Sequence, residues 1–131
     1  MIEKKFKEIK NKYRKTRKIQ CPAFNNEPII LGTHFWTHIK FNKNKRKRTN
    51  SVILSKLNSI KAMIDITKNI TYFQDTHIGK DKNTIMHFWT IIAMVDGTRY
   101  GIIIRKKGKQ GNKHFYSIIP NYKGSIPRKE S

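Results

Sequence analysis

The sequence of 131 residues is about the length of one domain, and its 29 Lys and Arg against 8 Asp and Glu give a formal net charge of +21 at pH 7. A folded chain with this imbalance repels itself, so a polyanion is the expected partner, and nucleic acid, above all RNA, is the expected substrate. The single cysteine, Cys21, excludes an internal disulfide and a cysteine-rich zinc site, and no apolar run approaches the ~20 residues of a membrane-spanning helix.

The first 21 residues form a basic N-terminal segment that is either helical or loosely attached. Its apolar residues Phe6, Ile9 and Tyr13 make a stripe narrower than the apolar face of helices that bind membrane surfaces. We therefore expect no membrane partner and a cytoplasmic protein, in its own cell or in a cell to which it is delivered. The predicted organisation is a basic segment at 1–21, an α+β domain at 22–122 and a flexible tail at 123–131.

Residues 29–41 are rich in β-branched and aromatic side chains, which predicts a strand after the proline-flanked loop 22–28. Side chains of a strand alternate between its two faces, and Phe35 and Ile39 are expected on the core face. The opposite face is expected to present His34, Trp36, His38 and Lys40. Residues 42–48, with the sequence NKNKRKR, are predicted to be a cationic loop.

The second half of the sequence predicts a helix followed by a β-meander. Apolar residues recur at helical spacing from Ile53 to Ile64, which predicts a helix over 51–69 with Asn50 or Ser51 as its N-cap. Three strands are predicted at 84–95, 98–106 and 113–119, with Asp96-Gly97 as a two-residue hairpin turn. The predicted fold class is α+β, with N-terminal helices packed against a curved antiparallel sheet of about four strands.

The acidic residues do not cluster. Nucleases that use two metal ions need converging carboxylates, and the sequence has no DxD pair on a predicted strand. It also contains no phosphate-binding glycine motif and no nucleophile elbow. We therefore expect neither a metal nor another cofactor.

RNA can be cleaved without a metal, because its own 2′-hydroxyl can attack the neighbouring phosphate. This reaction needs a base, an acid and fixed cations that stabilise the phosphorane. The polar residues inside the apolar blocks are of these types: His34, His38, Arg48, Arg105, His114, Tyr116 and Ser117. Each also has a structural interpretation, since a strand histidine is commonly a half-buried, hydrogen-bonded residue, and His77 and His87 are interpreted in that way.

The segments HFWTHIKFNKNKRKR and GIIIRKKGKQGNKHFYSI, with a helix between them, resemble the barnase–EndoU–colicin–RelE-like (BECR) nucleases. The resemblance covers roughly residues 22–120 and is greatest to the small phage-encoded proteins and contact-dependent inhibition toxins of this group. It implies helices on a four-stranded antiparallel sheet and a metal-independent endoribonuclease, often directed at tRNA. Carried over to this sequence, the resemblance implies a site built from His38, Arg48, Arg105, His114 and Ser117.

The expected reaction is transesterification by the 2′-hydroxyl, which leaves a 2′,3′-cyclic phosphate. His38 is the expected general base or acid, Arg48 and Arg105 stabilise the phosphorane, Ser117 binds a phosphate oxygen, and His114 is the second candidate for proton transfer. His34 could instead hold the role of His38, and the choice among His114, Tyr116 and Ser117 stays open. The expected substrate-binding residues are His34, Lys40, Lys45, Arg46, Lys47, Lys106, Lys107 and Tyr116.

The expected partners are RNA, in particular tRNA, and an acidic immunity or antitoxin protein if the enzyme is a toxin, because opposite charge speeds association. The alternative function is a non-catalytic basic module that binds RNA or DNA. It needs the same charge and the same aromatic residues but no group for proton transfer.

Overall fold

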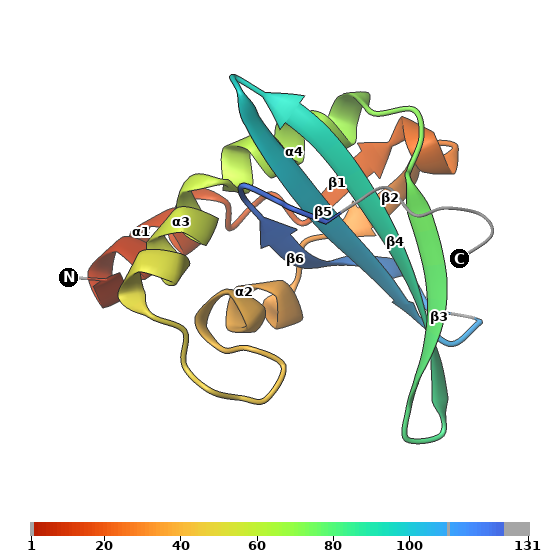
Figure 1. Cartoon of the computed structure of the whole chain (residues 1–131), viewed down its shortest axis with the longest axis horizontal. Helices are drawn as coiled ribbons and strands as arrows, with labels where there is room; N and C mark the ends of the chain where they lie inside the picture. Colours follow the sequence, from red (N-terminus) through yellow and green to blue (C-terminus); the bar gives the residue numbers. More distant parts are fainter. Residues whose placement is uncertain (1, 110, 125–131) are drawn as a thin grey trace.

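The computed structural model describes residues 2–109 and 111–124, and within them the chain forms an α+β fold with one six-stranded sheet. The C-terminal part of the predicted tail, 125–131, lies outside the described residues. In chain order the elements are α1 Ile2–Lys12, β1 Lys18–Cys21, the short 3-10 helix η1 Pro22–Phe24, β2 Glu27–Ile30, α2 Thr33–Lys40, α3 Asn50–Asn58, α4 Ile60–Asn69, β3 Asp75–Asp81, β4 Thr84–Val95, β5 Thr98–Lys107 and β6 Lys113–Ile119 (Figure 1).

The sheet has the strand order β1-β2-β6-β5-β4-β3. All neighbouring strands are antiparallel except β2 and β6, which run parallel over a short stretch. The predicted meander of β4, β5 and β6 is confirmed, and its first turn has positive φ at Asp96 (50°) and Gly97 (81°), as a hairpin turn of type I′ requires. The sheet has more strands than the predicted four, because the short strand β1 and the edge strand β3 were not predicted.

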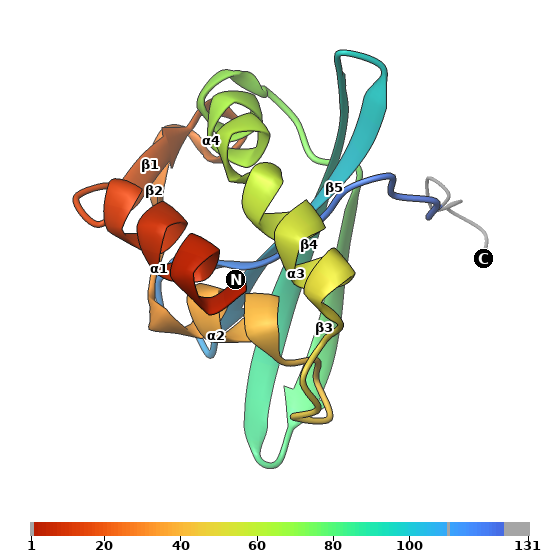
Figure 2. The same ribbon diagram turned by 90° about the vertical axis from the view of Figure 1, so that its left-hand side faces the viewer.

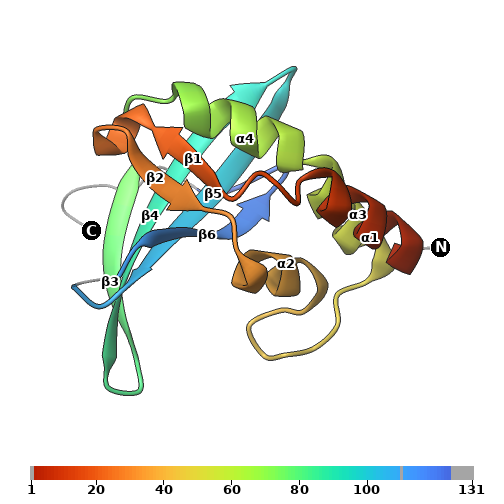
Figure 3. The ribbon, with the colours of Figure 1, turned by 180° about the vertical axis from the view of Figure 1, so that it is seen from behind.

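The helices lie on one face of the sheet (Figures 2 and 3). Ile53, Leu57 and Met63 from the helical layer belong to one buried cluster with Ile102 and Ile104 of β5. Phe6 of α1 and Ile19 of β1 are part of the same cluster. The basic N-terminal segment therefore contributes a helix and an edge strand to the core.

The strand predicted over 29–41 is wrong beyond Ile30, because residues 33–40 form helix α2. Three side chains of α2, Phe35, Trp36 and Ile39, are buried, including the Trp36 that the strand prediction placed on the polar face. Their spacing fits one face of a helix, and the gain from burying all three outweighs the β-propensity of the segment. Helix α2 packs against β6 just past the end of β2.

The helix predicted over 51–69 is two helices, α3 and α4, with a break at Ser59. The Ser59 hydroxyl donates a hydrogen bond to the Ser55 carbonyl at 2.8 Å, an interaction that commonly bends helices. The N-cap of α3 is Thr49 rather than Asn50 or Ser51, since Thr49 Oγ1 accepts the backbone N–H of Val52 at 3.3 Å. The predicted apolar stripe is nevertheless buried in both helices.

Candidate active site around His38

A bulge in β6 directs Tyr116 toward α2. The register between β5 and β6 passes from Ile103 opposite Ser117 to Ile104 opposite Phe115, so Tyr116 is an extra residue in β6. Such a bulge changes the direction of a side chain relative to regular strand alternation. Phe115 is buried in the core against Phe35 of α2, and Tyr116 is left half-buried on the surface of the sheet.

Two histidines of α2 stack on the ring of Tyr116. The ring centroids of His38 and Tyr116 are 4.5 Å apart with an interplanar angle of 28°, and those of His34 and Tyr116 are 5.5 Å apart at 19°. The two histidines are four residues apart and so lie on one face of the helix, with 6.4 Å between their centroids. His38 is half-buried in this stack, whereas His34 is exposed.

Arg48, at the end of the cationic loop, holds His38 in place. Its Nε donates to the His38 carbonyl at 3.0 Å, and its Nη2 lies 3.3 Å from His38 Nε2. A guanidinium has donors only, so Nε2 accepts this bond and the neutral ring carries its proton on Nδ1. The backbone N–H of Arg48 also donates to the Lys40 carbonyl at 2.7 Å, which ties the end of the loop to the end of α2.

Arg105 approaches Tyr116 from β5. Its guanidinium carbon lies 4.8 Å from the centroid of the Tyr116 ring. Arg105 is directly opposite His114 of β6 in the register, so the strands bring the two side chains to the same face. Three of the residues predicted to be catalytic, His38, Arg48 and Arg105, therefore lie around Tyr116, and His114 is the strand neighbour of Arg105.

An open cleft of about 440 Å³ lies beside His38, and we call it the His38 cleft. Its walls come from α2, the cationic loop, α3, β5 and β6. It is lined by His38, Asn42, Lys43, Arg48, Lys56, Ile103, Tyr116, Ser117 and Ile119. The lining side chains are cationic, aromatic or uncharged and include no carboxylate, so the cleft suits an anionic ligand.

Lys56 of α3 is a member of this cleft that the sequence prediction missed. It is 7% exposed, and its Nζ donates to the Ile118 carbonyl at 2.7 Å. Burial, and after it the charge of Arg48, lowers the pKa of Lys56 to about 8. A signal was available in the sequence, because Lys56 is three residues after Ile53 and four before Ile60 and so lies within the apolar stripe of the predicted helix.

The three histidines around the cleft favour the neutral form. Burial, followed by the charges of Arg48 and Lys56, lowers the pKa of His38 to about 4. Burial and the charge of Arg105 also lower the pKa of His34 and that of His114. At neutral pH His38 is therefore an unprotonated ring among fixed cations, and this state can accept a proton.

Two of the predicted substrate-binding residues, Lys40 and Lys106, lie away from the cleft. Lys40 forms an ion pair with Glu3 at 2.9 Å, and its Nζ lies 4.3 Å from the centroid of the Phe6 ring, so it joins α2 to α1 and does not line the cleft. Lys106 alternates with Arg105 along β5 and therefore points to the opposite face of the sheet. Side chains at the exposed end of the cationic loop and on the Arg105 face remain accessible to a ligand: Lys45, Arg46, Lys47 and Lys107.

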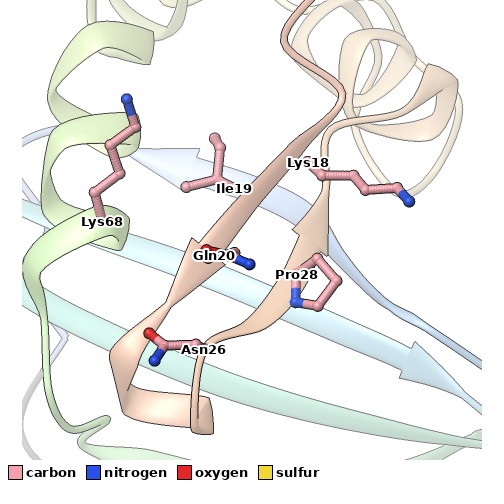
Figure 4. Close-up of a pocket in the computed structure, with 6 residues that line it drawn as sticks. All are labelled: Lys18, Ile19, Gln20, Asn26, Pro28 and Lys68. Carbon is pink, nitrogen blue, oxygen red and sulfur yellow. The ribbon is translucent and has the colours of Figure 1, made fainter.

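A larger hollow, of about 710 Å³, lies at the edge of the sheet beside β1 and β2. Its cationic residues, Lys18 and Lys68, point away from each other, and Gln20 and Asn26 are its other polar residues (Figure 4). The residues that line this hollow include no histidine. The His38 cleft is therefore the better candidate for chemistry, although it is the smaller of the two.

The chemistry of the site rests on one proton acceptor, three cationic side chains and two hydroxyl groups: His38, Arg48, Arg105, Lys56, Tyr116 and Ser117. Within residues 2–109 and 111–124, no group of three or more His, Cys, Asp or Glu side chains could hold a metal ion. No helix in the same part of the chain is long and apolar enough to cross a membrane. In comparisons with known proteins, no family model, no curated protein and no solved structure matches this chain.

Proposed function

We propose that this protein is a metal-independent endoribonuclease that cleaves structured RNA, tRNA in particular, by transesterification through the 2′-hydroxyl. The observation that carries the proposal is the neutral His38 ring, bonded to Arg48 and stacked on Tyr116 in a cleft without carboxylates. The resemblance to the BECR nucleases predicts the same reaction and is part of the proposal.

His38 is the general base in this proposal. When RNA binds, a phosphate oxygen replaces His38 Nε2 as the acceptor for Arg48 Nη2, and the lone pair of Nε2 becomes free. Nε2 then takes the proton of the 2′-hydroxyl as the 2′-oxygen attacks the phosphorus. His38 is preferred over His34 for this step because only His38 has its orientation fixed, by the bonds from Arg48 and by its half-buried stack.

The phosphorane gains negative charge, and the cleft offers cations to stabilise it. Arg48 and Lys56 line the cleft, and Arg105 lies over the ring of Tyr116, which also lines it. Ser117, which is 7% exposed in the same cleft, donates its hydroxyl to a phosphate oxygen. Removing one such preorganised donor typically costs a factor of ~10² to 10³ in kcat.

His114 is the second proton-transfer group. The charge of Arg105 helps to keep its ring neutral in the free protein. A phosphate bound beside Arg105 offsets that charge, so the pKa of His114 rises and the ring can carry a proton. Protonated His114 then donates to the 5′-oxygen as the P–O bond breaks, which leaves a 5′-hydroxyl and a 2′,3′-cyclic phosphate.

The net charge of +21 fits RNA and also an inhibitor of opposite charge. If the enzyme acts as a toxin, an acidic immunity or antitoxin protein that covers the cationic loop and the His38 cleft is the expected partner. Such a protein would slow cleavage by blocking the same cations that bind phosphate.

The test is incubation of the purified protein with total tRNA in excess EDTA, followed by a denaturing gel and mass spectrometry of the new ends. Wild type is expected to give discrete fragments that end in a 2′,3′-cyclic phosphate. His38→Ala should lower the cleavage rate by a factor of ~10² to 10⁴, as expected for loss of a general base. His34→Ala should lower the cleavage rate by a smaller factor, because no hydrogen bond from Arg48 fixes the His34 ring.

His87→Ala is the matched control, since it removes a histidine whose ring lies beside Trp89, with 5.8 Å between the ring centroids, and not beside Tyr116. Thermal melting of each variant shows whether the fold is retained. Intact tRNA with wild type, together with a salt-sensitive mobility shift on a native gel, would reject the nuclease and leave a non-catalytic binding module.

A further inference from the structure

A row of four side chains crosses the open face of the sheet in register. His77 of β3 pairs with Phe88 of β4, Phe88 with Arg105 of β5, and Arg105 with His114 of β6. Directly paired residues point to the same face, so these four side chains form a line that ends beside the His38 cleft. We call them the cross-strand row.

The cross-strand row lies on the face that the helices leave uncovered. Side chains alternate along a strand, so Phe88 and the core residue Ile91 point to opposite faces, as do Arg105 and the core residue Ile104. The helices cover the core face, and the β3–β4 hairpin projects beyond them (Figures 1 and 2). His77 is exposed and Phe88 is half-buried.

The aromatic members of the cross-strand row are arranged as a stack. The ring centroids of His77 and Phe88 are 4.8 Å apart with an interplanar angle of 12°. The ring centroids of Phe88 and Tyr116 are 5.8 Å apart with an interplanar angle of 74°, which is an edge-to-face contact. Aromatic contact is thus continuous from His77 to the ring on which His38 stacks.

Aromatic rings next to cations on an open strand face match the chemistry of an unpaired nucleic acid strand. Unpaired bases stack on rings, and cations such as Arg105 bind the phosphates between them. Bases inside a duplex are already stacked on one another and cannot reach such a platform. The cations beside the rings on this face are Arg105 and Lys107 of β5, and Asp75 of β3 lies on the same face as His77.

We propose that the cross-strand row is a stacking platform for unpaired bases, so that the enzyme cleaves RNA within single-stranded segments or loops. This inference rests on the proposed function, which supplies the cleaved phosphate in the His38 cleft. Strands β3 and β6 are separated by three strand spacings of about 4.8 Å, which is ~14 Å in total. A dinucleotide bound in the cleft is therefore too short to reach His77. A longer unpaired strand can reach it.

The first arm of the test measures binding without cleavage. A fluorescein-labelled single-stranded DNA hexamer lacks the 2′-hydroxyl and stays intact, and its Kd is measured by anisotropy at fixed salt. His77→Ala and Phe88→Leu are each expected to raise this Kd about 5- to 150-fold, the loss of one stacked base. His87→Ala, on the same strand as Phe88 but on the opposite face, is expected to leave it unchanged.

The second arm measures cleavage. For each protein, kcat/KM is measured with an RNA hexamer and with a dinucleotide, and the first value is divided by the second. This ratio should be lower in His77→Ala and Phe88→Leu than in wild type. The cause should be a higher KM for the hexamer, while the kcat for the hexamer is retained. The DNA arm does not depend on catalysis, so a protein that cleaves nothing can still show the platform. Variants that bind the hexamer as tightly as wild type, with an unchanged kcat/KM ratio if RNA is cleaved, would overturn the proposal.

Discussion

Arg48 holds His38 by two hydrogen bonds, one from Nε to the backbone carbonyl at 3.0 Å and one from Nη2 to Nε2 of the ring at 3.3 Å. The first bond fixes the guanidinium against the helix, and the second selects the ring tautomer with its proton on Nδ1. One side chain therefore connects the cationic loop, the end of α2 and the proposed base.

Replacing Arg48 by Gln should raise the pKa of His38, because the substitution removes a positive charge beside the ring. The rise should begin from about 4 and stop below the ordinary value, since burial is the larger cause of the lowered pKa. An NMR titration of the histidine ring signals measures the shift directly. Arg46→Gln, in the same loop but exposed, is the matched control. A His38 pKa that does not move in Arg48→Gln would show that the contact has no electrostatic effect.

Replacing Lys56 by Met should change how the stability of the protein depends on pH. In wild type the pKa of Lys56 is lowered from about 10.5 to about 8 by burial, so between these values the unfolded state binds more protons than the folded state. The free energy of unfolding therefore gains a contribution that rises with pH from about 8 to about 10.5. Below pH 8 the burial of the charged ammonium lowers the free energy of unfolding by a constant amount. Above pH 10.5 the free energy of unfolding rises no further from this group.

Urea unfolding at pH 7.5 and at pH 10 measures this effect. In Lys56→Met the rise between the two pH values should be smaller than in wild type. Lys68→Met, an exposed lysine of α4, is the control and should follow wild type. An identical rise in Lys56→Met and wild type would mean that Lys56 titrates in the folded protein as it does in the unfolded chain.

Neutralising the exposed end of the cationic loop should weaken RNA binding by the same factor for all sequences. The triple variant Lys45→Gln/Arg46→Gln/Lys47→Gln removes three charges, so the slope of log K against log salt should become less steep by about 2 to 3. Filter binding of tRNA to His38→Ala, with and without the loop substitutions, measures the slope while cleavage is suppressed.

A second triple variant serves as the control for the loop: Lys18→Gln/Lys61→Gln/Lys68→Gln, on β1 and α4. This control has the same net charge as the loop variant but keeps the cationic loop intact. Its slope of log K against log salt should therefore remain closer to that of His38→Ala without further substitutions. Equal slopes for the two triple variants would show that RNA binding depends on the net charge of the protein and not on the charges of the loop in particular.

The β-meander and the apolar stripe of α3 and α4 could be predicted because their signals are local. The Asp96-Gly97 turn requires positive φ at both residues, and few other sequences meet that requirement at low cost. The conformation of 33–40 could not be predicted in this way, because β-branched and aromatic residues favour strands until tertiary packing decides otherwise. Burial of Phe35, Trp36 and Ile39 on one side of α2 is a property of the assembled core.

The candidate site shows the same division. His34 and His38 share one face in a strand and in a helix alike, because a spacing of four residues is two strand repeats and close to one helical turn. The sequence by itself therefore determined their pairing, together with the cationic charge that surrounds them. Only the tertiary structure decided what they face: the Tyr116 bulge, the buried Lys56 and a row of side chains from four strands. Those contacts depend on strand register and helix docking, which join residues far apart in the chain and are not encoded in any local pattern.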